Sequence, residues 1–175
     1  MACDLTTGRL EPCKDSNGGL RAIYFINYDS GLYDNLIFDC EEIQGLTNPV
    51  TCYKYELKGA NSFDEANENS RENGSSFWTG TGTFVFKKQD LATQTQLKIL
   101  SYGRPQMILE DYNGNFRLAG TKNGCDCVVN TASGSAMGDL NGYNITSTSQ
   151  DGDMATFIDD AIMGEVDGFV IIEGT

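Results

Sequence analysis

The chain has 175 residues, of which 39% are hydrophobic, and this is enough for one domain with a substantial core. Its 20 glycines and 3 prolines suit a turn-rich globular protein, and the composition excludes a disordered chain. The formal net charge of −13 argues against a protein that grips nucleic acid by its phosphates.

The acidic charge is concentrated in the last third of the sequence. Lys122 is the last basic residue, and the residues that follow it carry nine acidic side chains. Two interpretations stay open. The acids either keep the protein soluble or form a surface that repels phosphate.

The first half of the chain predicts an arm, several strands and a loop. Residues 1–20 are polar and glycine-rich, which indicates an extended N-terminal arm. Strand signals rich in β-branched and aromatic residues follow at 21–27, 35–39 and 50–57. Residues 59–75 contain one large apolar residue, Phe63, and therefore predict a long polar loop.

The segment 77–88 again has strand character. Gly80 and Gly82 interrupt it, and we expect them to permit a bulge or a bend. One helix is predicted directly afterwards, with Asp90 as its N-cap and Gly103 after its last turn.

The remaining chain predicts strands joined by tight turns. Asn113-Gly114 is a type I′ turn dipeptide between two apolar runs, so residues 105–120 should form a hairpin. Four further strands are expected at 125–130, 143–149, 154–158 and 168–174. With nine or ten strands and a single helix, residues 1–175 predict one mainly β domain, an antiparallel sandwich or barrel with one packed helix.

Several kinds of chemistry are absent from the sequence. There is no histidine, so neither a Ser-His-Asp nor a Cys-His arrangement can form. There is no phosphate-binding or dinucleotide fingerprint, and the Asp111, Asn113, Asn115 spacing suits a hairpin turn better than a calcium loop. We therefore expect no enzyme, no catalytic or cofactor-binding residues and no bound metal.

The six cysteines leave three alternatives open: free thiols, one or two disulfides, or a metal site. No apolar run reaches the ~18 residues of a membrane span, and the first residues lack the apolar core of a secretion signal. These features predict folding in the cytoplasm and no membrane segment.

Three stretches of the sequence carry a resemblance to a known family. Residues 9–28, 86–124 and 133–150 resemble structural proteins of tailed phages, notably those that infect Bacteroidetes, and are most similar to the tail tube (major tail) protein. The resemblance implies a two-sheet sandwich or barrel with one flanking helix, assembled into stacked hexameric rings in the phage tail of the virion. Its partners would be other copies of the chain and other tail proteins, and DNA would pass through without specific binding.

Two sets of residues follow from this expectation. The small-residue stretch 131–142 would be a compact loop pressed against a neighbouring subunit, although an ordinary surface loop is the alternative. The expected subunit interface consists of Phe63, Ser135, Ala136, Gly138, Phe169, Val170 and Ile171. The expected acidic lining of the lumen consists of Asp139, Asp151, Asp153, Asp159 and Asp160.

Other functions remain as alternatives. A head decoration protein, a fibre domain or a carbohydrate-binding β-module would present an aromatic platform, for which Tyr53, Tyr55, Phe77 and Trp78 are the candidates. A neck or tail-terminator subunit would share the fold and differ in its partners. The six cysteines are not required by the tail tube pattern.

Overall fold

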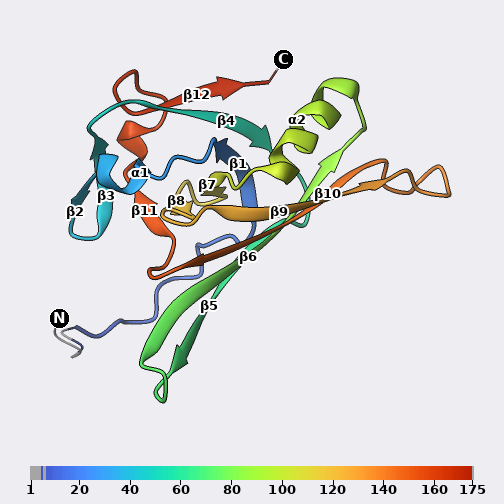
Figure 1. Ribbon diagram of the computed structural model, residues 1–175. Helices are drawn as coiled ribbons and strands as arrows, with labels where there is room; N and C mark the ends of the chain where they lie inside the picture. The colour runs from blue at the N-terminus through green and yellow to red at the C-terminus, as the bar shows by residue number, and fades with distance from the viewer. Residues whose placement is uncertain (1–4, 6, 175) are drawn as a thin grey trace.

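The computed structural model describes residue 5 and residues 7–174, and it contains two β-sheets and one main helix (Figure 1). Strands make up 49% and helices 11% of the chain, so the predicted mainly β class with one packed helix is confirmed. Twelve strands lie in the described residues, more than the nine or ten expected. Residues 7–19 run along the surface without regular structure before the first strand.

The larger sheet has eight strands in the order β12-β4-β1-β7-β8-β11-β3-β2. Most neighbours are antiparallel, and the pairs β12–β4 and β11–β3 are parallel. The strands are β1 (Leu20–Ile26), β2 (Leu36–Asp39), β3 (Glu42–Leu46), β4 (Val50–Glu56), β7 (Gln106–Asp111), β8 (Phe116–Ala119), β11 (Thr156–Ile158) and β12 (Phe169–Glu173). Two short helices accompany this sheet, α1 (Leu32–Asn35) and the 3-10 helix η1 (Asp160–Ile162).

One face of the eight-stranded sheet encloses a core of its own. Each of its eight strands contributes at least one buried side chain to a single cluster, so the sheet curls around that cluster in the manner of a partial barrel. The buried side chain of Leu32 in α1 also packs in this cluster. The strand residues in it are Ala22, Tyr24, Ile26, Leu36, Ile43, Cys52, Ile108, Leu118, Ile158 and Phe169.

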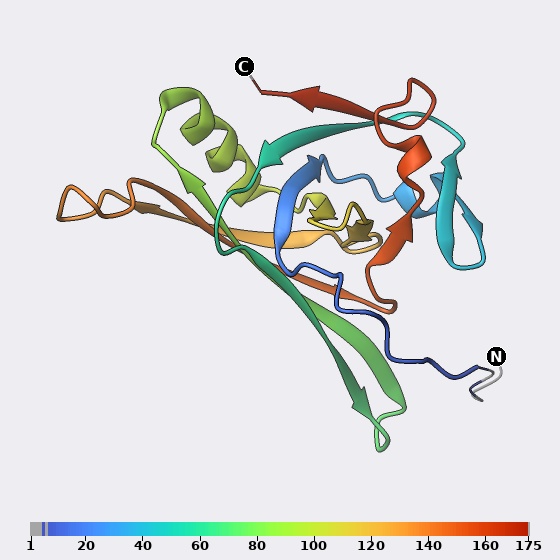
Figure 2. The same ribbon diagram turned by 180° about the vertical axis from the view of Figure 1, so that it is seen from behind.

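The smaller sheet has four antiparallel strands in the order β5-β6-β10-β9. They are β5 (Ser62–Ser70), β6 (Ser75–Lys87), β9 (Cys125–Ala132) and β10 (Gly142–Asp151). β5 with β6 and β9 with β10 form two hairpins, whose ends project from opposite sides of the body (Figures 1 and 2). Both hairpins therefore extend beyond the part of the sheet that packs on the core.

The predicted loop at 59–75 is wrong for most of its length, because Ser62–Ser70 is a strand. β5 pairs with β6 over nine residues, from Ser62 opposite Thr83 to Ser70 opposite Ser75. The sequence of β5 lacks the alternating apolar residues that predict a strand, because much of this hairpin lies outside the core and does not need them. Phe63 is the exception, and it is 9% exposed within the main core.

Gly80 and Gly82 do not produce the expected bulge. The register of β6 with β10 continues without a shift from Trp78 to Lys87. A Cβ atom on Gly80 would collide with the Phe63 ring and the Ser149 hydroxyl, and one on Gly82 with the Phe84 ring and Ser147. The glycines are therefore needed because the ends of aromatic rings occupy the space that a Cβ atom would take.

The main core lies between the two sheets and under the helix α2 (Leu91–Tyr102). Tyr55 of β4 contacts Phe25 edge-on, with ring centroids 5.4 Å apart, and stacks on Phe86 of β6, with ring centroids 5.3 Å apart. These contacts join the two sheets. Leu97 is the buried side chain of α2, and Leu100 packs partly against the same core. Among the described residues, neither this helix nor any other is long and apolar enough to cross a bilayer.

The predicted ends of α2 are confirmed in part. The Asp90 carboxylate accepts a hydrogen bond from the Thr93 backbone N–H at 2.7 Å, as an N-cap does. Gly103 ends the helix at the C-cap with φ −91°, so its position does not depend on a left-handed backbone.

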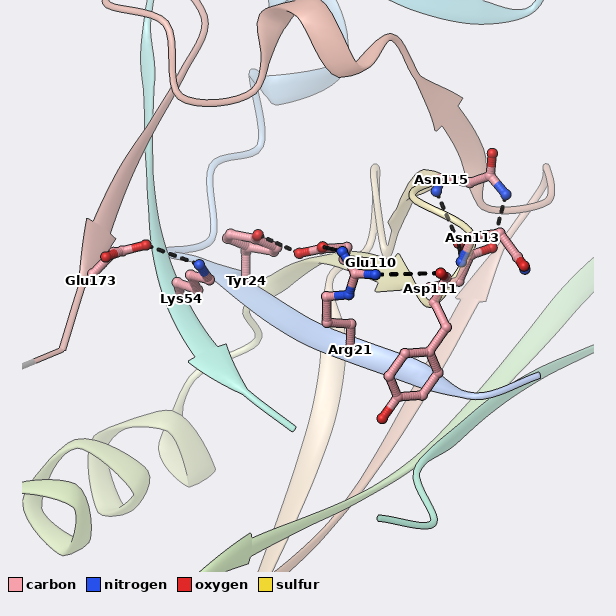
Figure 3. Close-up of polar contacts among 9 residues, drawn as sticks. Arg21, Tyr24, Lys54, Glu110, Asp111, Asn113, Asn115 and Glu173 are labelled. Carbon is pink, nitrogen blue, oxygen red and sulfur yellow. Dashed lines mark hydrogen bonds and ion pairs between the residues drawn. The ribbon is translucent and has the colours of Figure 1, made fainter. Parts of the chain in front are cut away.

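The predicted hairpin at 105–120 is confirmed as β7 and β8, but its turn is not type I′. Only Gly114 of the dipeptide has a positive φ, +86°. The Asp111 carboxylate holds the turn by accepting from the Asn113 N–H at 2.8 Å and from the Asn115 N–H at 2.9 Å (Figure 3). A longer turn built around an aspartate replaces the two-residue turn.

Candidate assembly surface

The two faces of the four-stranded sheet differ sharply in chemistry. Residues 79–83 of β6 read Thr-Gly-Thr-Gly-Thr, and residues 146–149 of β10 read Thr-Ser-Thr-Ser. Because side chains alternate along a strand, the glycines and serines face the core and the threonines face outward. Thr81 lies opposite Thr148, and Thr83 opposite Thr146. All four threonines are exposed, so the centre of the outward face presents small hydroxyl groups, with the exposed Val128 opposite Thr146.

The charged residues of this outward face are mainly acidic. Asp64 lies opposite Thr81, Thr81 opposite Thr148, and Thr148 opposite Asp126, so one row with an acid at each end crosses all four strands. Glu68 also lies on this face, where it accepts a hydrogen bond from the Thr79 hydroxyl at 2.7 Å. Lys87, at the last position of β6, is the one basic residue of these strands on that side.

Neither edge of the four-stranded sheet has a partner strand in the described part of the chain, although helix α2 and the segment after it contact β9. β5 and β9 end the strand order, and no strand of the described residues pairs with their outer sides. The Cys125 N–H donates to the Pro105 carbonyl at 2.8 Å, away from β10. Because backbone groups alternate in an antiparallel ladder, the N–H groups of Cys127, Val129 and Thr131 point the same way. β9 therefore presents a row of backbone donors and acceptors at its edge.

The expected interface at the C-terminal strand is only partly available. β12 is an edge strand of the eight-stranded sheet and pairs with β4 along its whole length. Phe169 is fully buried in the core of its own chain, while Val170 and Ile171 are half-buried. Lys54 Nζ lies 2.9 Å from Glu173 Oε1 and fastens the end of the strand (Figure 3). Phe169 and Phe63 thus serve the fold of one chain and cannot anchor a neighbour.

The small-residue stretch forms the end of the β9–β10 hairpin. Its first and last residues belong to strands, so the loop proper spans 133–141. Ser135, Ala136 and Gly138 are exposed there. The Asp139 carboxylate accepts from the N–H groups of Ser135 and Ala136, both at 2.8 Å. These bonds lower the pKa of Asp139 and fix the shape of the loop.

The five acids expected to line a lumen do not share a surface. Asp139 lies in the loop before β10, where its carboxylate binds Ser135 and Ala136, and Asp151, at the far end of β10, alternates to the core-facing side of the sheet. Asp151 is half-buried, which raises its pKa, and Asp153 pairs with Lys122 at 3.6 Å. Asp159 caps η1 through the Ala161 N–H, and Asp160 is exposed beside it. The acids that do share the outward face are Asp64, Glu68 and Asp126. They lie in β5 and β9, and only the register between strands brings them onto one face, which sequence spacing does not reveal.

A buried polar network supports the larger sheet (Figure 3). Glu110 is 8% exposed, and its carboxylate accepts from the Tyr24 hydroxyl at 2.6 Å and contacts Arg21 Nη1 at 3.4 Å. Burial, and then the hydrogen bond with Glu110, raises the pKa of Tyr24 far above its usual value. Arg21 reaches this position because a register shift between Leu20 and Ala22 interrupts β1. The network fastens β1 to β7.

The five described cysteines are free thiols. Cys52, Cys125 and Cys127 are buried, and Cys13 and Cys40 are exposed. Burial raises the pKa of Cys52 and of Cys127 to about 12, so these thiols stay protonated at neutral pH. Within the described part of the chain, no three His, Cys, Asp or Glu side chains gather as a metal site would require.

The aromatic platform expected for a binding module does not form. Tyr55 is in the core, Tyr53 belongs to the other sheet, and Phe77 and Trp78 point to opposite faces of β6. A different set of apolar side chains lines a groove of about 610 Å³. They are Tyr33, Phe38, Trp78, Met154 and Phe157. Sequence reasoning missed this groove because its residues come from segments far apart in the chain.

Comparison with known proteins finds no matching family model, no matching curated protein and no matching solved structure.

Proposed function

We propose that the chain is a structural subunit of a phage tail tube, which assembles into stacked rings around a channel for DNA. The resemblance of three sequence stretches to tail tube proteins supports the proposal, and so does the two-sheet fold with one helix. The observation that carries it is the four-stranded sheet, which has two edges without a partner strand among the described residues and one exposed polar face.

The geometry of this sheet suits closure into a ring. Its four strands alternate in direction, so the edge strands β5 and β9 run in opposite directions. When copies are related by rotation about an axis along the strands, β9 of one copy meets β5 of the next as an antiparallel pair. A continuous ring of strands then removes every open edge of this sheet, which would otherwise be prone to aggregation.

The outward face has the chemistry of a channel wall for DNA. It presents threonine hydroxyls together with Asp64, Glu68 and Asp126. Carboxylates repel phosphates, and a wall almost free of Lys and Arg cannot displace the counterions condensed on DNA, so it gains no binding energy from their release. The acidic lining therefore comes from Asp64 and Glu68 of β5 and Asp126 of β9 in this proposal, in place of Asp139, Asp151, Asp153, Asp159 and Asp160.

Electron microscopy and light scattering of the purified chain test the proposal. We expect rings or tubes, with six copies per ring as the resemblance implies. Thr131→Pro removes an edge-facing N–H without breaking the β9–β10 ladder, so it should leave monomers with an unchanged circular dichroism spectrum. Thr131→Val keeps the N–H and should assemble.

Other results would point to other functions. A wild-type chain that stays monomeric at high concentration, or a Thr131→Pro variant that forms rings, would contradict closure through this edge. Rings that never stack would favour a neck or terminator subunit.

A further inference from the structure

The groove next to α1 is an exposed apolar surface on an otherwise acidic protein. Tyr33, Phe38, Met154 and Phe157 are 40%, 40%, 51% and 50% exposed, and all four line it. The rings of Tyr33 and Phe38 lie 5.5 Å apart. Apolar side chains gathered in this way mark an interaction site. The volume of about 610 Å³ is comparable to that of small-molecule pockets, ~300–1,000 Å³, and admits a few residues of a loop.

The groove has a polar rim. Lys122 Nζ lies 4.2 Å from the centre of the Tyr33 ring and 3.6 Å from Asp153 Oδ2. Glu41 and Thr156 also line the groove. An apolar centre with charged residues around it is the usual anatomy of a protein interface.

Met137 is the matching projection on the same chain. It lies in the loop 133–141, and its side chain is fully exposed. The bonds that Asp139 accepts from Ser135 and Ala136 hold the loop around it in one shape. The loop backbone therefore needs little ordering on binding, and the Met137 thioether packs well against aromatic rings.

The projection and the groove lie at opposite ends of the same two strands. At the loop end Gly142 of β10 pairs with Lys87 of β6, and at the groove end Asp151 pairs with Trp78. The ten residues of β10 place these ends about 30 Å apart. Figure 1 shows the loop after β9 on one side and α1, β2 and β11 on the other. The two features cannot meet within one chain.

We propose that Met137 of one copy inserts into the aromatic groove of a copy in the adjacent ring. This inference rests on the proposed tube function and names the contact that stacks the rings. The contact is head-to-tail, so a stack of any length keeps a free loop face at one end and a free groove face at the other and can grow without limit. Every subunit repeats the contact around the ring, which makes a weak single contact sufficient.

The test uses one substitution at each end of the contact. Met137→Glu places a charge on a fully exposed side chain, and Phe157→Glu places one in the groove opposite Arg117 of β8. Neither position belongs to the edges β5 or β9. We expect each variant alone to form single rings and no tubes, while Val166→Glu, at another exposed apolar residue, still forms tubes.

A mixture of the two variants gives the sharpest result. Rings of Met137→Glu keep an intact groove, and rings of Phe157→Glu keep an intact loop. One contact can therefore form between them, and the outer faces of that pair are both blocked. We expect mass photometry to show ring pairs of twice the single-ring mass and nothing longer.

Trp78 provides an independent signal, because it is the single tryptophan of the chain and lines the groove. Its fluorescence should shift to shorter wavelength when wild-type rings stack, and the shift should be lost in Met137→Glu. A blue shift of the wild-type monomer with an oligosaccharide panel, with stacking unaffected by Met137→Glu, would assign the groove to a carbohydrate instead.

The outcomes separate the two proposals. Wild-type tubes that persist in both variants, or single-ring variants whose mixture yields no ring pairs, would overturn the Met137 contact and leave the tube function standing. A wild-type chain that forms neither rings nor tubes would overturn both.

Discussion

The carboxylate of Asp139 shows how one side chain determines the shape of a loop of small residues. Residues such as Gly, Ser and Ala give a loop no core of its own. Here Asp139 Oδ2 accepts three hydrogen bonds, from the N–H and hydroxyl of Ser135 and from the N–H of Ala136. Gly134 has a positive φ of +69° and leaves no room for a Cβ beside Asp139. The loop is therefore compact although it is exposed.

The order of this loop should depend on pH. The hydrogen bonds favour the ionised form of Asp139, so its pKa in the folded chain is lowered from the ordinary value of about 3.9. The stabilisation is then complete above that ordinary value and is lost as the pH falls through the lowered pKa. We expect the amide NMR signals of Ser135 and Ala136 to be constant from pH 7 to pH 5 and to move only below about pH 4.

Two variants make the measurement specific. Asp139→Ala should give the disordered shifts at every pH, whereas Gly138→Ala should behave as the wild type because nothing lies within 4 Å of the added methyl group. Signals of Ser135 that already move between pH 7 and pH 5 would show that the carboxylate does not hold the loop.

Elements differ in how much of their structure the sequence reveals. The helix α2 and the hairpin β7–β8 could be predicted because local signals define them, an aspartate cap in one and Asn113-Gly114 in the other. β5 could not, because its pairing with β6 needs no apolar pattern where the hairpin leaves the core. The groove and the row from Asp64 to Asp126 depend on the register between strands, which local patterns do not encode.

The position of strand β12 determines how deleting it should affect the stability of the monomer. The sequence predicted a strand at 168–174 whose apolar residues, Phe169 among them, contact a neighbouring subunit. The structure makes β12 an edge strand but buries Phe169 in the core cluster of the larger sheet. Removing residues 168–175 should therefore destabilise the monomer by about 3–5 kcal/mol, as loss of a buried Phe does.

Chemical denaturation of the monomer distinguishes this core role from an assembly role. Phe169→Ala should lower the unfolding free energy by a similar ~3–5 kcal/mol. Ile172→Lys, at a side chain that is 46% exposed, should change it little. A truncated chain as stable as the wild type would mean that β12 contributes no core and acts only between subunits.

At the scale of the whole molecule, the proposed contacts lie in perpendicular directions. The open edges of β5 and β9 face sideways across the strands, and the loop 133–141 and the aromatic groove lie at the strand ends. Sideways contacts close a ring, and end-to-end contacts stack rings. The outward face is left free of both kinds of contact, which is the position that a channel wall requires.

The charge of that wall should decide whether DNA slides or sticks. Asp64, Glu68 and Asp126 are exposed and point away from the core, so replacing all three with Lys should leave assembly intact. Tubes of this variant should retain labelled duplex DNA at 50 mM salt, protect it from nuclease and release it at 200 mM, with at least a ~10-fold loss of affinity. Wild-type tubes should retain none.

The matched control reverses three exposed acids remote from the four-stranded sheet, Asp160, Glu165 and Asp167. It changes the net charge by the same amount, so DNA that it attracts should stay on the outside of the tube and remain open to nuclease. If both variants protect DNA from nuclease equally, the outward face does not line the lumen. Protection by the first variant alone follows if Thr81, Thr148 and the acids beside them line the channel, because only there does one wall surround the duplex on every side.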